Sequence, residues 1–341
     1  MMESNDSCRW LSKVGRLLTP CCFILFLSAC VQSSDCFRED VLCAALVTDT
    51  QGIEDQDMNQ DTWAGLEQAK ADGIVQRVEF IESIDSRDYE KNINYFADLG
   101  FDVIFTVGAG MDDETLRAAD RKPFDPAQGG VGTVFVGLNQ PQSESRPNLI
   151  PVAFPEDQMG FLAGALAARI TKTQVVGAVC ETSGIDSMWR YCEGFRAGVD
   201  FFNKEAGAGI EPLVVYREDG DREKLFLDEA WGAETAQGLI KRGADVIFAA
   251  GGATGQGALQ AAAEAGVQTI GSESGPGGVT TVLGDASSAV RQILQHEPLS
   301  PSIKYIPLDQ TFPEHLTREM DLLLSALQSG EVKTNVTSSK P

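Results

Sequence analysis

The chain has 341 residues, of which 43% are hydrophobic and 23% are charged, a composition typical of folded globular proteins. Its formal net charge at pH 7 is −23. Such a negative charge argues against nucleic acid and against an anionic membrane surface as partners, because like charges repel. We interpret the excess of acidic side chains as a solvated surface that keeps the protein soluble.

The beginning of the chain has the pattern of an export signal. Arg9, Lys13 and Arg16 precede a mostly apolar run, 17–29. At about 1.5 Å per residue this run is too short to cross a hydrocarbon core of about 30 Å. It ends in Leu27-Ser28-Ala29-Cys30, which matches the lipobox of bacterial lipoproteins and predicts lipid attachment at Cys30. The lipid would then bind the bilayer. A plain secretory signal with an incidental cysteine is the alternative.

Four cysteines follow Cys30, and an exported protein meets oxidising conditions in which they can pair. Neither close spacing is Cys-x-x-Cys and no histidine lies near, so zinc binding and redox catalysis are not expected. We predict two local disulfides, Cys36–Cys43 and Cys180–Cys192. Free buried thiols are the alternative.

Short apolar runs alternate with helical patterns along the rest of the chain. This alternation is typical of parallel sheets connected by crossover helices, and it predicts an α/β fold. The predicted strands are 41–47, 76–81, 102–106, 133–136, 149–153, 174–179, 212–216, 245–249, 267–270 and 279–283. The Pro- and Gly-rich segment 125–132 is predicted to be a loop.

An internal similarity predicts two lobes. Asp102-Val103-Ile104-Phe105 returns as Asp245-Val246-Ile247-Phe248, an offset of 143 residues that has the size of a lobe. Chance similarity of two buried strands is the alternative. The predicted division is a signal peptide (1–29), a tether (30–40), a first lobe (41–150 and about 279–306), a second lobe (151–278 and about 307–332) and a tail (333–341).

The polar loop after the first predicted strand is a natural place for a ligand. It leads into a helix at whose start Asp57 and Gln60 have the spacing of a capping box, so Asp57 is interpreted mainly as a helix cap. At the carboxyl end of a parallel strand, free N–H groups and nearby Asp or Asn side chains face a crevice. The pattern Asp55, Asp57, Asn59 also resembles the start of a calcium loop. Gln60 and Leu66 occupy the places of the required Gly and Glu, so we predict no metal site.

The Gly-rich segment 251–257 follows a predicted strand and opens a helix, and Glu273 ends the next strand about 20 residues later. Glycines let a ligand approach the backbone, and a strand-end carboxylate accepts hydrogen bonds from ribose hydroxyls. The sugar can belong to NAD or to a free nucleoside. An exported protein would rarely meet NAD, so no cofactor is predicted.

Two aromatic side chains, Trp189 and Phe226, stand where helices are predicted to begin. Packing in a core is the ordinary role of such residues, but beside a cleft their rings would stack on a base. His296 and His315 are the only histidines, and neither belongs to a recognisable catalytic motif. We therefore predict no catalytic residues.

Four motifs stand in order between about 41 and 273. They are Val47-Thr48-Asp49 with the polar loop and Trp63-Ala64-Gly65, then 160–164, 193–199 and 243–248. Together they resemble the basic membrane lipoprotein family, which includes the purine-nucleoside-binding lipoproteins of bacterial ABC importers. Beyond Gly284 the likeness is faint.

This resemblance implies a type I periplasmic-binding-protein fold, with two doubly wound parallel-sheet lobes joined by a three-crossing hinge. It also implies that the lobes close on a nucleoside. Residues that match the family's ligand-binding places, or stand at helix starts beside them, are Asp49, Met58, Asn59, Asp112, Trp189, Phe226, Asp228, Gly252 and Glu273. Met58 replaces a family aromatic that would clamp the base with Phe226, Glu273 replaces an Asp, and the lysine expected around Ser287–Ser288 is absent.

The sequence therefore predicts a non-enzymatic substrate-binding protein of an ABC importer. It would be lipid-anchored at the outer face of the bacterial cell membrane, where it captures a nucleoside of the purine type and delivers it to an ABC permease. One alternative is a binding protein for another small polar or sugar-like ligand. A second is a ligand-sensing receptor that docks on a signalling partner, and a nucleoside-processing or NAD-dependent enzyme is third.

Overall fold

The computed structural model describes residues 36–55, 57–123, 132–140, 144–218, 221, 224–275, 278–308 and 311–341. The predictions for the signal peptide, for lipid attachment at Cys30 and for nearly all of the loop 125–132 lie outside these residues. No helix in the described part is long and apolar enough to cross a membrane.

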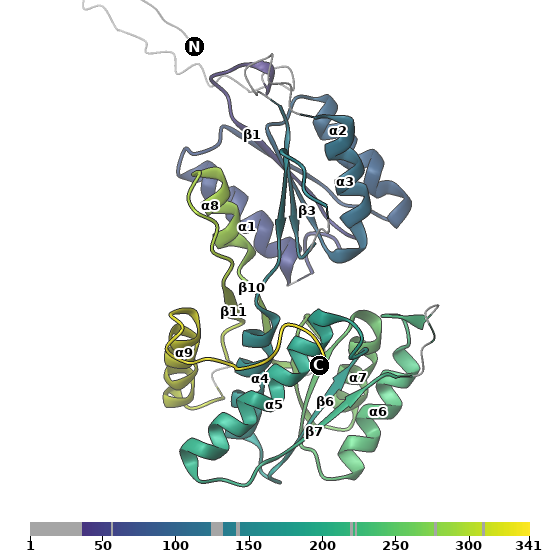
Figure 1. Ribbon diagram of the computed structural model, residues 1–341, viewed down its shortest axis with the longest axis vertical. Coiled ribbons are helices and arrows are strands. Elements are labelled where there is room, and N and C mark those ends of the chain that lie inside the picture. The colour runs from purple at the N-terminus through teal and green to yellow at the C-terminus, as the bar shows by residue number, and fades with distance from the viewer. Residues whose placement is uncertain are drawn as a thin grey trace, which may run out of the picture. The chain divides into compact units, whose positions relative to one another are not determined.

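The first lobe is built on a parallel sheet of five strands in the order β2-β1-β3-β4-β5. The strands are β1 (Cys43–Val47), β2 (Arg77–Ile81), β3 (Val103–Val107), β4 (Val134–Leu138) and β5 (Leu149–Val152). The helices are α1 (Met58–Ala71), α2 (Tyr89–Asp98), α3 (Asp112–Arg121) and α8 (Ala286–Leu294), with 3-10 turns at Ser86–Asp88 and Ala109–Met111. Every residue of β1 and β3 is buried, because helices cover both faces of the sheet (Figure 1).

The second lobe contains a sheet of six strands in the order β11-β10-β9-β8-β6-β7. The strands are β6 (Val175–Cys180), β7 (Glu211–Tyr216), β8 (Val246–Ala250), β9 (Gln268–Gly271), β10 (Gly278–Gly284) and β11 (Ile303–Tyr305). The helices are α4 (Glu156–Ile170), α5 (Asp186–Ala206), α6 (Glu229–Lys241), α7 (Gly252–Glu264) and α9 (Glu314–Gln328). All neighbouring strands run parallel except β10 and β11.

All ten predicted strands are confirmed, with ends that differ by no more than two residues. The structure adds β11, whose three residues are too few to form a recognisable alternating pattern.

The segment 279–306 does not belong wholly to the first lobe, as the predicted division has it. β10 and β11 join the second sheet, while α8 between them packs against α1. Gly65 of α1 makes this contact close, because a Cβ there would lie 2.8 Å from Cα of Ser287. Lys304 of β11 forms an ion pair with Asp61 of α1 and so fastens this part of the chain to the first lobe.

Two of the four family-like motifs serve helix packing. Gly160 and Gly164 of α4 face α5, and Gly194 and Gly198 of α5 face α4. A Cβ on Gly160 would lie 1.9 Å from the carbonyl oxygen of Tyr191, and one on Gly198 would lie 2.0 Å from that of Phe161. Only glycine permits the two backbones to come this close.

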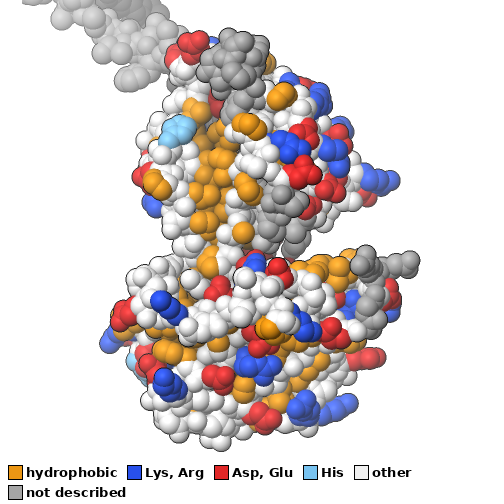
Figure 2. All heavy atoms as spheres, in the orientation of Figure 1, with side chains coloured by type: hydrophobic (Ala, Val, Ile, Leu, Met, Phe, Trp, Pro, Cys, Tyr) orange, Lys and Arg blue, Asp and Glu red, His pale blue; other side chains and the backbone are white. Residues whose placement is uncertain are grey.

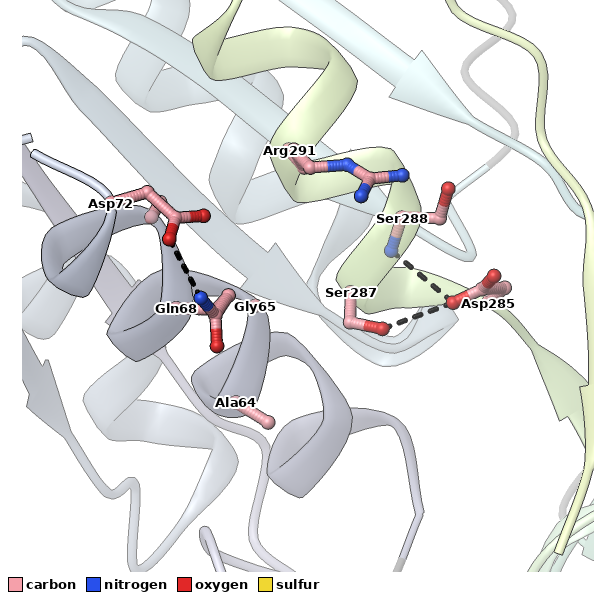
Figure 3. A pocket seen from close by; sticks show the side chains of 9 residues that line it. Ala64, Gly65, Gln68, Asp72, Asp285, Ser287, Ser288 and Arg291 are labelled. Atoms are coloured by element: carbon pink, nitrogen blue, oxygen red, sulfur yellow. Dashed lines mark hydrogen bonds between the residues drawn. The ribbon is translucent and has the colours of Figure 1, made fainter. Parts of the chain in front are cut away.

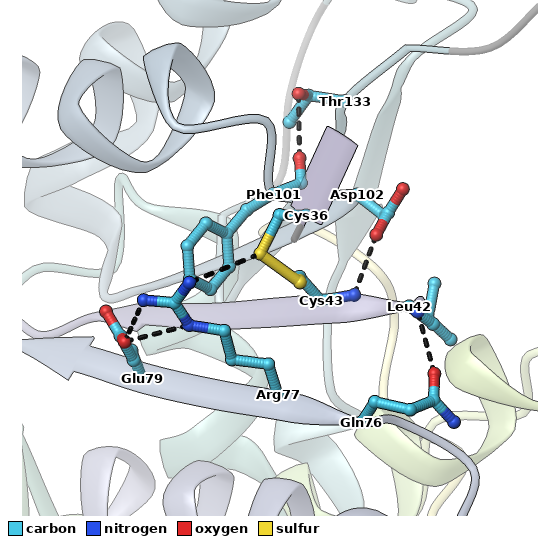
Figure 4. Close-up of a disulfide and its surroundings, with 9 residues drawn as sticks. All are labelled: Cys36, Leu42, Cys43, Gln76, Arg77, Glu79, Phe101, Asp102 and Thr133. Carbon is cyan, nitrogen blue, oxygen red and sulfur yellow. Dashed lines mark hydrogen bonds and ion pairs between the residues drawn. A yellow bond between two sulfur atoms is a disulfide. The ribbon is translucent and has the colours of Figure 1, made fainter. Parts of the chain in front are cut away.

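Both predicted disulfides are present, and the cysteine Cα atoms are 5.7 Å apart in Cys36–Cys43 and 6.4 Å apart in Cys180–Cys192. The first ties the segment before β1 to that strand (Figure 4). Beside it the guanidinium of Arg77 lies 5.2 Å from the centre of the Phe101 ring. The second disulfide ties the end of β6 to α5.

Charged side chains of both signs are scattered over the visible face of the molecule, with no large single-sign patch (Figure 2). Positive and negative side chains are mixed on this face, as is usual for a solvated surface.

Candidate ligand-binding site

A cavity of about 400 Å³ lies at the carboxyl ends of strands from both sheets. The first lobe contributes the residues after β1, β3 and β4 and the start of α1. The second lobe contributes the starts of α4, α5 and α7, the loop that holds Phe226, and the residues after β9. This volume is within the range of sites that enclose small organic ligands.

Six of the nine predicted ligand-binding residues line this cavity. They are Asp49, Met58, Asn59, Phe226, Gly252 and Glu273. The structure therefore brings together residues that lie up to 224 positions apart in the chain. Asp49, Gly252 and Glu273 each stand two residues after a strand, at the carboxyl edge of a sheet, and Met58 and Asn59 begin the helix that follows β1.

The other three predicted residues lie away from the cavity wall. Asp112 begins α3 and its Oδ1 accepts the N–H of Asp113 at 2.9 Å. Asp228 accepts the N–H of Trp231 at 3.1 Å, so it caps α6, and it also pairs with Lys224 at 3.3 Å.

Trp189 is turned away from the cavity by helix geometry. Two residues along an α-helix correspond to about 200° of rotation, so Trp189 lies opposite Ser187 and Tyr191, which do line the cavity. Its ring stacks on Tyr216 at 6.0 Å, and its Nε1 donates to Oγ1 of Thr337 at 3.1 Å. The Trp189 ring therefore covers the outside of the second lobe.

The cap of α1 is Asp55, and the prediction that Asp57 caps this helix is wrong. Oδ1 of Asp55 accepts the N–H groups of Asp57 at 2.9 Å and of Gln60 at 3.0 Å. Oδ2 of Asp55 accepts the N–H of Asn59 at 3.0 Å. The side chain of Asp57 makes no capping bond, and it lies on the cavity wall with 8% of its surface exposed. The capping-box spacing is misleading because the preceding turn brings Asp55 closer to the free N–H groups.

The amide of Asn59, a residue of the cavity wall, is fixed by two carboxylates. Its Nδ2 donates to Oδ1 of Asp49 at 2.9 Å and to Oδ2 of Asp55 at 2.8 Å, which fixes the orientation of the amide. Its Oδ1 is buried and has no hydrogen-bond partner among the described residues. A buried acceptor without a partner costs free energy.

The electrostatics of the wall are set by buried carboxyl groups. Burial raises the pKa of Asp57 to about 8, and repulsion from Glu273 and Asp55 adds to this. Burial also raises the pKa values of Asp49 and Glu273. For Glu156, burial raises the pKa, although Arg190 opposes the shift through a contact of 2.8 Å. The cavity therefore holds its carboxyl groups in a medium that disfavours unpaired negative charge.

Phe226 is held in place by the glycines after β8. Its backbone has a φ of 63°, a left-handed conformation that is rare for a bulky side chain. Its carbonyl oxygen accepts the N–H of Ala253 at 2.9 Å, and a Cβ on Gly252 would lie 3.0 Å from that oxygen. The Gly-rich turn thus has a structural role in seating the Phe226 loop.

Sequence reasoning missed several residues of the wall. Tyr89 at the start of α2, and Met188 and Tyr191 on α5, add apolar surface. Glu156 at the start of α4 adds a fifth acidic side chain. Spacing on α5 does not by itself identify Tyr191, because the sequence does not show which face of this helix lies on the cavity.

A second cavity, of about 330 Å³, lies between α1 and α8 (Figure 3). Its polar side chains are largely bonded to one another: Gln68 donates to Asp72 at 2.8 Å, and Asp285 accepts from Ser287 and Ser288. Within the described ranges no group of three His, Cys, Asp or Glu side chains is arranged to hold a metal ion.

Comparisons with known proteins agree with this architecture. The chain is 29% identical over 245 residues to the CD4+ T-cell-stimulating antigen of Listeria monocytogenes, a match covering 68% of this chain and 62% of that protein. It is 26% identical over 224 residues to the ABC transporter nucleoside-binding protein BmpA of Lactococcus lactis, a match covering 65% of this chain and 58% of that protein. The chain therefore spans about three fifths of the length of the curated relatives it matches.

Among solved structures, an ABC transporter solute-binding protein from Conexibacter woesei has a TM-score of 0.60 and 22% identity, covering 86% of this chain and 98% of that one. This likeness, with the two parallel-sheet lobes, confirms the predicted type I periplasmic-binding-protein fold. A family model described as "ABC transporter substrate-binding protein PnrA-like" matches residues 43–275. Because this match covers more than half of the chain, the protein belongs to the PnrA-like family of ABC transporter substrate-binding proteins.

Proposed function

We propose that the protein captures a nucleoside, of the purine type, in the cavity between its two lobes and delivers it to an ABC permease. The observation that carries this proposal is a single cavity in which apolar side chains from opposite lobes accompany hydrogen-bond acceptors. A nucleoside has the matching parts, a flat base and a ribose with hydroxyl donors.

The base would lie between Met58 of the first lobe and Phe226 of the second. Both side chains line the cavity and both pack against the main hydrophobic core. A ring stacked on a base contributes about 1–3 kcal/mol per base. The thioether of Met58 is polarisable and adaptable, so it can lie against the other face of the base.

The ribose would be held by the carboxyl groups at the strand ends. Asp49 follows β1 and Glu273 follows β9, and both line the cavity. Each carboxylate oxygen accepts hydrogen bonds from hydroxyl groups, as the acidic residue of a dinucleotide site does. Asn59 lines the same cavity and bonds Asp49, so it would hold that carboxyl group in place.

The predicted export signal and the lipobox-like Leu27-Ser28-Ala29-Cys30 support an extracytoplasmic location for this activity. Lipid on Cys30 would hold the protein at the outer face of the bacterial cell membrane, beside its permease. The name of the Lactococcus lactis relative, a nucleoside-binding protein, supports the same ligand class.

Thermal unfolding of the full chain in detergent tests this proposal. The panel consists of adenosine, guanosine, inosine, cytidine, uridine, ribose, glucose and galactose. A ligand at 100 times its dissociation constant adds about 2.7 kcal/mol to the free energy of unfolding. We expect the purine nucleosides to raise the melting temperature most. Stabilisation only by the free sugars would indicate a sugar-binding protein, and no shift at millimolar concentration would contradict the proposal.

A further inference from the structure

The tail, residues 333–341, crosses the start of α5 on the outside of the second lobe (Figure 1). Oγ1 of Thr337 accepts the indole N–H of Trp189 at 3.1 Å. The carbonyl oxygen of Ser338 accepts a hydrogen bond from Nη1 of Arg190 at 2.9 Å. Both partners stand within the first five residues of α5, so the tail holds this end of the helix.

The tail is fastened to the second lobe at two further points. Near its start, the hydroxyl of Thr334 donates a hydrogen bond to the carboxylate of Asp157, in the first turn of α4. Near its end, Nζ of Lys340 donates to Oγ of Ser183 at 2.6 Å and lies 3.7 Å from Oε1 of Glu218. The tail thus joins the start of α4, the start of α5 and the loops that follow β6 and β7.

The helix starts that the tail holds also carry part of the cavity wall. Lining residues on these two helices include Glu156, Met188 and Tyr191. Asp157 directly follows the first of them, and Trp189 and Arg190 stand between the other two. Neighbouring residues of an α-helix point about 100° apart, so one face of these turns can form the wall while another meets the tail. The tail therefore supports the wall from the outside.

Arg190 connects the tail directly to the wall. Its Nη2 lies 2.8 Å from Oε2 of Glu156, and its Nε donates to the same oxygen at 2.9 Å. The side chain of Glu156 is only 5% exposed, so loss of the guanidinium would leave a buried carboxylate without its ion-pair partner. One guanidinium therefore bonds both the tail, at Ser338, and the wall, at Glu156.

We propose that the tail is a positioning element of the ligand site, which sets ligand affinity chiefly by holding Arg190 against Glu156 at the starts of α4 and α5. This inference rests on the proposed function, because the cavity is the one assigned to the nucleoside. No residue of the tail is among the described residues that line the cavity, so the tail acts through the residues that it holds. A site depends on such support, since lining groups left loose lose the geometry that the ligand requires.

Removal of the tail tests this inference by isothermal titration with adenosine, in detergent at neutral pH. A chain that ends at Val332 should bind about 5-fold or more weakly than the full chain. Arg190→Gln should weaken binding to a similar extent, because it breaks the connection between the tail and Glu156. In the Arg190→Gln background, removal of the tail should weaken binding by less than about 2-fold further, since residues that act through one another are not additive.

Arg169→Gln is the matched control. Like Arg190, this arginine bonds one glutamate and one backbone carbonyl, Glu319 at 3.1 Å and Ala165 at 2.9 Å, and does not line the interlobe cavity. The substitution removes similar contacts from the second lobe and should leave adenosine affinity within about 2-fold of wild type. Circular dichroism establishes that each variant is folded. An equal loss of affinity in Arg169→Gln would indicate general destabilisation and overturn the inference.

Amide hydrogen exchange tests the positioning without any ligand. Removal of the tail should speed exchange in residues 186–192, at the start of α5, by about 10-fold or more and leave exchange in α6 unchanged. If the full chain does not bind adenosine, the proposed function fails and the exchange result decides this inference. Unchanged exchange at the start of α5, or an adenosine affinity that removal of the tail leaves unchanged in a chain that binds adenosine, overturns it.

Discussion

Nδ2 of Asn59 donates a hydrogen bond of 2.9 Å to Oδ1 of Asp49. This bond joins the first turn of α1 to the end of β1 and fixes the orientation of the amide, whose Oδ1 has no partner among the described residues. One contact therefore fixes two residues of the first lobe that line the cavity. The site depends on the buried bonds between Asp49, Asp55 and Asn59 as much as on the residues that would touch the ligand.

Asn59→Ala should weaken both the fold and ligand binding. The substitution removes two buried hydrogen bonds to carboxylates, and we expect the free energy of unfolding to fall by about 1–3 kcal/mol. Urea denaturation measures this loss, and titration with a purine nucleoside measures the loss of affinity. Gln260→Ala is the control, since this exposed amide bonds only Glu264 at 2.6 Å, and its effect should stay within about 0.5 kcal/mol. Equal effects of the two substitutions would contradict the role given to Asn59.

Met58→Phe should tighten purine-nucleoside binding. The new ring would give the base a second stacking face opposite Phe226, and stacking contributes about 1–3 kcal/mol per base. Isothermal titration of wild type and variant with the same nucleoside measures the change. Leu322→Phe, at a position with 65% of its surface exposed on α9, should leave affinity unchanged. Unchanged or weaker binding by Met58→Phe would point to a ligand without a flat base.

The stability of the unliganded protein should fall as pH rises across the range set by Asp57. Its carboxyl group has an ordinary pKa of 3.8, which burial first and then repulsion from Glu273 and Asp55 raise to about 8 in the fold. Between these values the folded protein keeps a proton that the unfolded chain has lost. The free energy of unfolding therefore decreases with pH, by up to about 1.4 kcal/mol per pH unit for one proton.

Urea denaturation across this pH range measures the slope for wild type and for Asp57→Asn. The variant should have the smaller slope and should be the more stable protein near neutral pH, because Asn has no proton to lose. A slope remains in the variant, since burial also raises the pKa values of Asp49 and Glu273. Identical slopes would show that Asp57 is ionised in the folded protein.

Gly198→Ala should disrupt the contact between α4 and α5. The added Cβ would lie 2.0 Å from the carbonyl oxygen of Phe161, and the helices must separate to relieve this clash. We expect a loss of about 3 kcal/mol or more in the free energy of unfolding. Gly238→Ala on α6 is the matched control, because no atom lies within 4 Å of its Cβ, and it should stabilise the protein by about 0.5–1 kcal/mol. Equal effects of the two changes would refute the packing role of Gly198.

The sequence was sufficient to predict features that repeat along the chain or that join residues close together in it. The ten strands follow from short apolar runs, and both disulfides join cysteines no more than 12 positions apart. The family resemblance named six residues that lie on the cavity wall, and three of them, Asp49, Gly252 and Glu273, stand two residues after a strand, at the carboxyl edge of a parallel sheet.

What the sequence could not give depends on the exact direction of side chains and on distant contacts. Whether Trp189 or Tyr191 faces the cavity is decided by the rotation of α5, and a shift of two residues exchanges its faces. The prediction gave Asp57 the capping role that Asp55 has. The path of the loop before α1 decides which side chain reaches the free N–H groups of the helix, and this path cannot be read from residue spacing. The pairing of β10 with β11 joins positions about 20 residues apart around α8, and no local pattern encodes it.

A crystal structure of the full chain with a bound purine nucleoside tests the central claim most directly. The account predicts that the base lies between Met58 and Phe226 and that ribose hydroxyls bond Asp49 and Glu273. A nucleoside bound elsewhere, such as between α1 and α8, or an interlobe cavity filled by a ligand without a base, would contradict it.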